Sequence, residues 1–160
     1  MKKYRVLFLI LASICIVTVA KSHNYLDFVV DEYSRLMPFW QKMASCTPYQ
    51  VLIPYIDTSS PYAKELPDIA NKNKVYKVFG TNDNNSCHVK IQNYDCYFPM
   101  NIAKEYANTE IAYSKKKIEN IKKNRNFSAS SGEAEMQKTA QYNSTYCKLQ
   151  FYVPERVKIN

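Results

Sequence analysis

Between residues 24 and 44 the apolar positions recur at steps of three and four, as they do on one face of a helix. Charged side chains occupy the opposite face, and Asn24 suits the position that caps a helix N-terminus. Pro38 has no backbone N–H to donate, so the pattern predicts a kink or a break there, with a last piece that reaches Ala44. The apolar stripe, which is typical of a core-facing helix, comprises Leu26, Val29, Val30, Tyr33, Leu36, Met37 and Trp40.

Shorter segments alternate apolar and polar residues with a period of two, which is typical of half-buried strands. Residues 75–79 and 87–91 show this clearly, and the asparagine-rich segment 80–85 between them predicts a β-hairpin. In the second strand His88 lies on the face opposite Cys87. The other predicted strands are residues 49–56, 96–98 and 146–153, and the predicted loops and turns are residues 57–72, 92–95 and 124–132.

A second helical pattern begins after Pro99, with Asn101 as its expected cap, and extends to about Lys123. A short further helix is predicted around residues 133–141. The fold class that follows is α+β. We expect an amphipathic N-terminal helix and a second, basic helix to pack on a small antiparallel sheet of three to five strands.

The N-terminus has the features of a secretory signal peptide. Three basic residues precede an uncharged run, residues 6–20, which ends in Thr18-Val19-Ala20. An uncleaved anchor is the alternative, but this run is shorter than the roughly 20 residues that span a bilayer. Lipidation at Cys15 is a third reading, although the preceding residue is Ile14 rather than a small one. We therefore predict a signal peptide at residues 1–20, a single secreted domain at residues 21–160, and no membrane span after cleavage.

The cysteine count agrees with export to an oxidising compartment. Once Cys15 leaves with the leader, an even number remains, and none of their spacings resembles the close pairs of a zinc site. Two disulfides are expected in any of three connectivities, which the sequence does not distinguish. The periplasm or the extracellular space is the predicted location. The four cysteines are Cys46, Cys87, Cys96 and Cys147.

Composition and charge exclude several classes of function. With only Gly80 and Gly132, the chain lacks the glycine-rich turns of phosphate-loop and dinucleotide-binding folds. Because residues 1–20 hold three basic residues and no acidic one, cleavage lowers the formal charge from +8 to +5. A cluster of cations in the second helix remains a candidate binding patch, or else only complements the helix dipole and aids solubility. The cluster consists of Lys115, Lys116, Lys117, Lys122, Lys123 and Arg125.

No catalytic constellation emerges from the sequence. His88 is the one histidine inside the folded region, it has Ser86 and Thr81 nearby, and the chain contains no nucleophile-elbow motif. Residues 82–85 lack the ligands of a calcium loop, so we read them as a hairpin tip. The carboxylates read as helix-surface groups, and Glu105 and Glu110 in particular suggest surface pairs with lysines. We therefore assign no catalytic residue, no metal ligand and no cofactor.

Two functional hypotheses remain. The first is an exported, non-catalytic binding or interaction domain held by two disulfides, since tyrosine-rich chains suit binding surfaces and 13 tyrosines follow residue 20. Its partner would be an acidic envelope or host component, or another exported protein. We expect no nucleic-acid binding, because no aromatic–basic interleaving matches an RNA-binding signature. The second is a small secreted hydrolase acting on envelope or host polymers, which would need His88 or two carboxylates to converge in a concave site.

Overall fold

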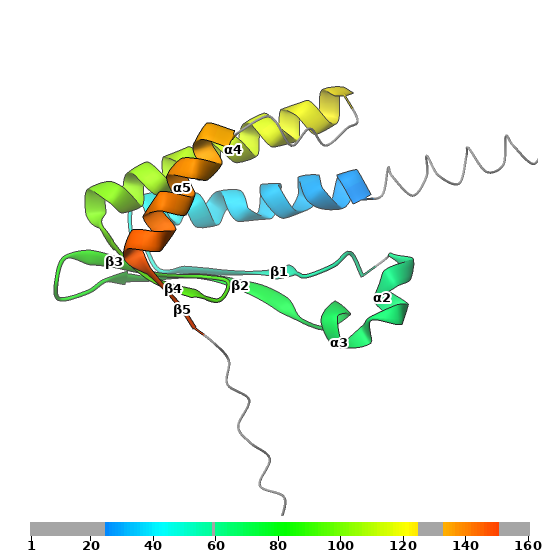
Figure 1. Cartoon of the computed structure of the whole chain (residues 1–160), viewed down its shortest axis with the longest axis horizontal. Coiled ribbons are helices and arrows are strands. Elements are labelled where there is room, and N and C mark those ends of the chain that lie inside the picture. Colours follow the sequence, from blue (N-terminus) through cyan, green and yellow to red (C-terminus); the bar gives the residue numbers. More distant parts are fainter. Residues whose placement is uncertain (1–24, 59, 125–132, 151–160) are drawn as a thin grey trace, which may run out of the picture.

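An antiparallel sheet forms one layer of the molecule in the computed structural model, which describes residues 25–58, 60–124 and 133–150 (Figure 1). The order of the five strands across the sheet follows their order in the chain. Each strand therefore pairs with its sequence neighbours. The strands are β1 (Tyr49–Pro54), β2 (Asn73–Thr81), β3 (Ser86–Ile91), β4 (Tyr94–Pro99) and β5 (Cys147–Leu149).

The long helices of the described ranges all lie on one face of the sheet (Figure 1). They are the N-terminal helix (residues 25–44), α4 (Met100–Asn124) and α5 (Glu133–Tyr146). Two short helices, α2 (Pro61–Glu65) and α3 (Pro67–Ala70), lie in the connection between β1 and β2. This arrangement, together with two disulfides, confirms the predicted α+β class with helices on an antiparallel sheet.

The hairpin turns use residues that tolerate a positive φ. Asn85 closes the β2–β3 turn at φ 56°, and the side chain of Asn82 accepts hydrogen bonds from the backbone N–H groups of Asn84 and Ser86. Gln92 has φ 56° in the β3–β4 turn. These local contacts fix the register in which the inner-face residues of β2, β3 and β4 meet the helices.

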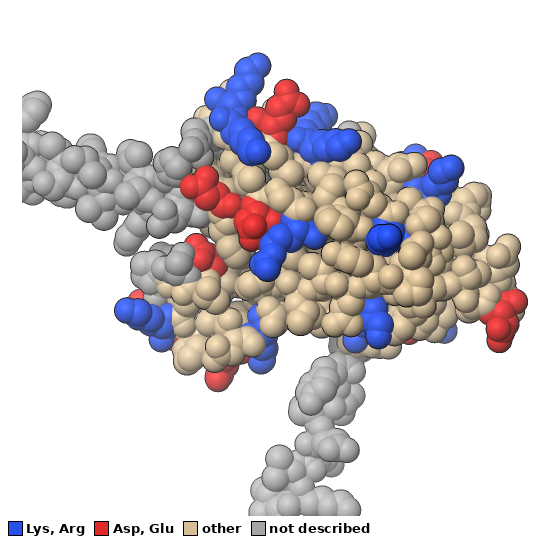
Figure 2. All heavy atoms as spheres, turned by 180° about the vertical axis from the view of Figure 1, so that it is seen from behind, with Lys and Arg blue, Asp and Glu red and all other residues tan. Residues whose placement is uncertain are grey.

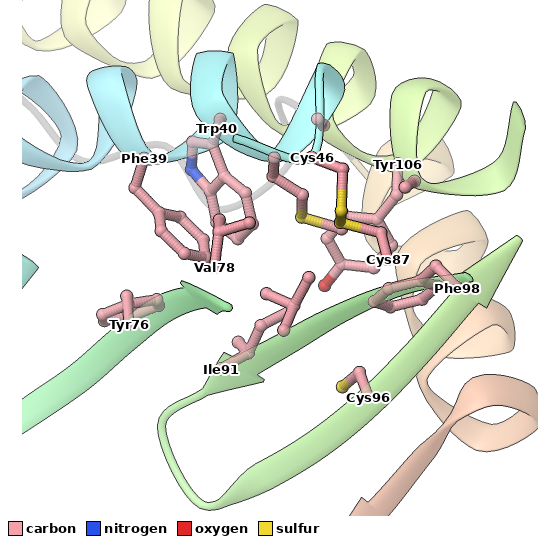
Figure 3. Close-up of a cluster of buried hydrophobic side chains, with 14 of the residues drawn as sticks. Phe39, Trp40, Cys46, Tyr76, Val78, Cys87, Ile91, Cys96, Phe98 and Tyr106 are labelled. Carbon is pink, nitrogen blue, oxygen red and sulfur yellow. A yellow bond between two sulfur atoms is a disulfide. The ribbon is translucent and has the colours of Figure 1, made fainter. Parts of the chain in front are cut away.

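The core fills the space between the helices and the inner face of the sheet (Figure 3). Phe39 and Met43 of the N-terminal helix are completely buried, although the predicted stripe did not include them. Trp40 packs edge-on against Phe39 and lies 6.2 Å from the ring of Tyr76. The sheet contributes Ile53, Tyr76, Val78, Cys87, Val89, Ile91, Cys96 and Phe98.

Both predicted disulfides form, and they connect elements that are distant in sequence. Cys46 ends the N-terminal helix with φ 50° and bridges to Cys87 in β3, 41 positions away. The N–H of Cys46 donates to Met43 O and that of Thr47 to Lys42 O, a Schellman termination that aims the thiol at the sheet. Cys96 in β4 bridges to Cys147 in β5 across 51 positions. The first bridge therefore holds a helix on the sheet, and the second holds its last strand.

Several local predictions were wrong. The predicted end of the N-terminal helix at Ala44 is correct, but no break occurs at Pro38, because the carbonyl that loses its partner belongs to Ser34 on the exposed side, where water can bind it. Residues 57–72 contain α2 and α3 rather than only loop, and a proline suits the first turn of a helix. α4 begins directly after β4, at Met100, so Asn101 lies inside the helix and does not cap it.

The C-terminal part also differs from the prediction. α5 runs on to Tyr146, and β5 is confined to three residues. The predicted signal peptide, most of the predicted loop 124–132, and the strand residues Phe151 and Val153 lie outside the described residues. In the part of the chain that is described, no helix is both long and apolar enough to cross a membrane.

Candidate functional site

A cavity of about 430 Å³ lies where the N-terminal helix, α4 and α5 meet β2 and the β3–β4 turn. Helical spacing places its walls. On the N-terminal helix Tyr33, Leu36 and Trp40 follow one another at steps of three and four, and on α4 Tyr106, Glu110 and Ser114 do so at steps of four. Each helix therefore presents one stripe to the same space.

Seven of the sixteen described residues that line the cavity are aromatic. Tyr33 and Tyr113 meet edge to face with ring centroids 5.9 Å apart, and Trp40 lies 5.8 Å from Tyr106. Two tyrosine hydroxyl groups of the wall have polar partners. Gln92 Nε2 donates a 2.5 Å hydrogen bond to the Tyr76 hydroxyl, and the Tyr106 hydroxyl donates to Asn143. Burial raises the pKa of Tyr76 to about 12 and that of Tyr33 further. The phenols of Tyr33 and Tyr76 are therefore neutral at physiological pH.

Glu110 is the most unusual titratable group of the cavity. It projects from α4 between Tyr106 and Tyr113, and burial raises the pKa of its carboxyl from 4.5 to about 7, although the Thr139 hydroxyl on α5 lowers this pKa in part. Near neutral pH the group therefore exists both protonated and ionised. A cation in the cavity would favour its ionised form.

A second carboxylate enters the same cavity from the N-terminal helix. Glu32 accepts a 2.6 Å hydrogen bond from Lys74 Nζ of β2, and both side chains are less than one-fifth exposed. This pair fixes Glu32 at the edge of the cavity and provides it with a countercharge. Glu110 has a hydroxyl partner instead, so the two carboxyl groups sit in different electrostatic surroundings.

Two buried polar atoms beside this cavity have no hydrogen-bond partner among the described residues. They are Trp40 Nε1 and Ser114 Oγ, in residues that are 4% and 0% exposed. An unsatisfied buried polar group costs about 1–3 kcal/mol, and native structures contain few of them. Both residues also line the cavity, but these two atoms themselves expose almost no surface.

The predicted candidates lie elsewhere in the fold. His88 projects from the outer face of the sheet, as expected from the alternation, and its ring stacks between Phe79 and Tyr97 at 4.2 and 4.4 Å. His88 Nε2 lies 2.6 Å from Asp95 Oδ1, and among the described residues no hydroxyl group joins this pair. The histidine is therefore part of a stacked surface ladder and not of a concave site.

The predicted basic patch is only partly assembled on the surface. Lys115, Lys116, Lys122 and Lys123 are exposed, and Figure 2 shows basic side chains over the end of α4 with acidic ones among them. Lys117 is instead 2% exposed, because it follows Ser114 by three residues on the buried side of the helix, and burial lowers its pKa. Arg125 lies outside the described residues.

The other predicted groups are placed as follows. Glu105 forms the expected kind of surface pair with a lysine, although its partner is Lys138 of α5. Glu110, for which a surface pair was also expected, lines the cavity instead. Residues 82–85 form the hairpin tip. Across the described residues, no group of three or more metal-ligating side chains gathers.

The cavity itself was missed by the sequence reasoning. A signal was available, because α4 carries Glu110, Ser114 and Lys117 at helical spacing on the same side as the buried Ala103 and Ala107. Polar residues that continue an apolar stripe indicate either a solvated end of a helix or a polar site. Only the position of the N-terminal helix opposite α4 distinguishes these two outcomes.

No protein-family model, no curated protein and no solved structure matches this chain.

Proposed function

We propose that this protein is an exported, non-catalytic binding domain that takes a small ligand into the tyrosine-lined cavity. The observation that carries the proposal is a cavity of about 430 Å³ whose wall combines tyrosine and tryptophan rings with the largely buried carboxyl group of Glu110. That volume lies in the range of small-molecule sites, which combine apolar walls with a few convergent polar groups.

Export supports this proposal and is in turn supported by the cysteines. The two disulfides are compatible with an oxidising compartment, and the N-terminal sequence has the order of charge, apolar run and small residues that signal peptidases recognise. The proposed location is the periplasm or the extracellular space. Mass spectrometry of the purified protein tests it: we expect a chain that begins at Lys21 without free thiols, and a chain that still begins at Met1 would contradict it.

Trp40 is the only tryptophan of the chain and lines the cavity, so its fluorescence reports on occupancy. The oxidised protein is titrated with organic cations, carboxylates, neutral sugars and aliphatic alcohols. We expect a saturable emission change with one of these classes. The same compound should stabilise the fold by about 2.7 kcal/mol at one hundred times its dissociation constant.

A variant that fills the cavity provides the control. Ser114→Leu should abolish the emission change, whereas Ser144→Leu, an exposed serine on α5, should preserve it. Far-UV circular dichroism shows whether each variant is folded, and Ser114→Ala provides a milder change if the leucine variant unfolds. Binding that survives Ser114→Leu, or no response to any of the four classes, would contradict the proposed site.

A second candidate function is a small hydrolase that acts on envelope or host polymers. The observation that favours it is that Glu32 and Glu110 line one cavity, the first paired with Lys74 and the second with its pKa raised to about 7. A protonated acid beside an ionised carboxylate is the arrangement that glycosidases use. The binding function ranks first because Glu32 is already paired with Lys74 and no described histidine or further carboxyl group lines the cavity.

Glycan hydrolysis distinguishes the two candidates. Purified peptidoglycan and chitooligosaccharides are incubated with the protein and with Glu110→Gln and Glu32→Gln. A hydrolase would release reducing ends and lose this activity at least one hundredfold in both variants. The binding domain should release none, while Glu110→Gln changes only its affinity for the ligand.

A macromolecular partner remains a separate part of the proposal. The exposed lysines at the end of α4, Lys115, Lys116, Lys122 and Lys123, suit an acidic envelope or host component, or another exported protein with an acidic surface. Binding to immobilised lipopolysaccharide at 50 and 200 mM salt tests this, with Lys115→Gln/Lys116→Gln/Lys122→Gln as the variant. We expect weaker binding at high salt and in the variant. Equal binding in all four conditions would contradict a role for these lysines.

A further inference from the structure

We infer that the ligand of the cavity is a small organic cation, a protonated or quaternary amine. The inference rests on the proposed function and adds to it the chemical class of the ligand. Among the described residues that line the cavity, the ionisable groups apart from tyrosines are Glu32 and Glu110, and no lysine, arginine or histidine is present. The wall therefore has acidic countercharges for a cation and none for an anion.

The nearby cations do not change this balance. Lys74 Nζ forms its 2.6 Å contact with Glu32. Lys117 Nζ lies 5.4 Å from the centre of the Tyr113 ring, and Lys117 is not among the described residues that line the cavity. The side-chain hydrogen bond that lowers the pKa of Glu110 comes from the Thr139 hydroxyl, and no cation contributes to that shift. Its carboxylate is thus the group a bound cation would pair with.

The aromatic walls favour the same class of ligand. Trp40, Tyr33, Tyr106 and Tyr113 contribute rings on two sides of the cavity, and the face of an aromatic ring attracts a cation. Such contacts contribute most where water is excluded, as it is around a buried tryptophan. Quaternary and primary ammonium groups are typically bound in this way, by rings together with one carboxylate.

Matched pairs of probes test the charge and shape separately. The pairs are choline with 3,3-dimethyl-1-butanol, glucosamine with glucose, and tyramine with 4-ethylphenol, each titrated against the oxidised protein by Trp40 fluorescence and calorimetry. In at least one pair we expect the cation to bind at least tenfold more tightly than its neutral counterpart. Glu110→Gln should remove that preference, whereas Glu119→Gln, an exposed carboxylate of the same helix, should retain it.

The outcomes separate this inference from the proposed function. Neutral members that bind as tightly as the cations in every pair, or a preference that survives Glu110→Gln, would overturn the cationic ligand and leave the cavity as a binding site. A lack of binding by all six probes would also overturn it. If the carboxylates, neutral sugars and aliphatic alcohols also fail to bind in the cavity, the proposed function is overturned as well. Unfolding curves of both glutamine variants show that a lost preference reflects the charge and not a lost fold.

Discussion

The N-terminal half of α4 packs closely on the core, whereas its C-terminal half borders the cavity. Ala103 and Ala107 are completely buried and bring the helix close to the sheet beside Phe98. One and two turns later the same side of the helix carries Glu110 and Ser114, and here a cavity of about 430 Å³ replaces the close packing. One helix therefore serves both a dense apolar core and a polar, aromatic site.

Both disulfides join the apolar core. Cys46, Cys87 and Cys96 belong to the same buried cluster as Ala103 and Ala107. That cluster also reaches the cavity wall through residues such as Trp40 and Tyr106, although the described wall contains no cysteine. Buried polar atoms and a neutralised carboxyl are costly to a fold. We infer that the close packing around Ala103 and Ala107 offsets the unfavourable buried polar groups around Glu110 and Ser114. Functional sites commonly reduce stability in this way.

Removing a disulfide should have the largest effect on this comparison. The paired variants Cys46→Ser/Cys87→Ser and Cys96→Ser/Cys147→Ser should each lower the free energy of unfolding by about 4 kcal/mol, because the closed loops are long. Urea unfolding of the oxidised proteins measures this. A loss below about 1 kcal/mol in both variants would show that the dense half does not depend on its bridges.

The second effect is a dependence of stability on pH that originates at the cavity. The pKa of Glu110 rises from 4.5 in the unfolded chain to about 7 in the fold. Between these values the unfolded chain has lost the proton that the fold retains, so stability falls as pH rises, by at most about 3 kcal/mol, and stays constant above pH 7. Urea midpoints at pH 5 and pH 8 measure the fall.

Glu110→Gln isolates this contribution, because an amide does not titrate. The difference in stability between the protein and the variant should change by that amount between pH 5 and 8, with the variant the less pH-sensitive of the two. The comparison removes the effects of all other titrating groups. An identical pH dependence in both proteins would place Glu110 in water rather than in the cavity wall.

A third test enlarges a side chain in the dense half. Ala107→Leu should lower the free energy of unfolding by about 2 kcal/mol, because a well-packed helix–sheet contact has no room for the added atoms. Thermal unfolding followed by circular dichroism measures the loss. Ala112→Leu, at an exposed position of the same helix, is the matched control and should have little effect. A neutral Ala107→Leu would mean that the dense half is loosely packed.

The smallest effect should have the opposite sign. Ser114→Ala removes a buried hydroxyl that has no partner among the described residues, so it should stabilise the unliganded protein by about 1 kcal/mol. Urea unfolding of the two proteins checks this. A destabilised Ser114→Ala in the unliganded protein would show that the hydroxyl is already satisfied.

Most of the fold was predictable because local patterns and tertiary packing agree. The hairpin β2–β3 follows from alternation and from a turn rich in asparagine, and Asn85 indeed adopts a positive φ. The helix over residues 25–44 follows from its apolar stripe. Pro38 misled because its penalty is local, whereas Phe39, Trp40 and Met43 on the same helix are buried against the sheet.

The candidate site was not predictable, since it exists only between elements. Glu110 resembles a surface residue beside lysines in the sequence, just as Glu105 does, and only the latter is one. Likewise, Lys117 belongs to a run of three lysines, and nothing in the run indicates which of them turns inward. The crossing of α4 over the N-terminal helix decides these cases.

The bridge between Cys96 and Cys147 has a consequence for when the cavity can work. α5 supplies Thr139 and Asn143 to its wall, and β5, which follows that helix directly, pairs with β4 over only three residues. While the thiols are reduced, α5 is held against the cavity only by its own packing contacts and by the three-residue pairing of β5 with β4. If the cavity binds a ligand as proposed, the reduced protein should therefore bind it more weakly than the oxidised protein.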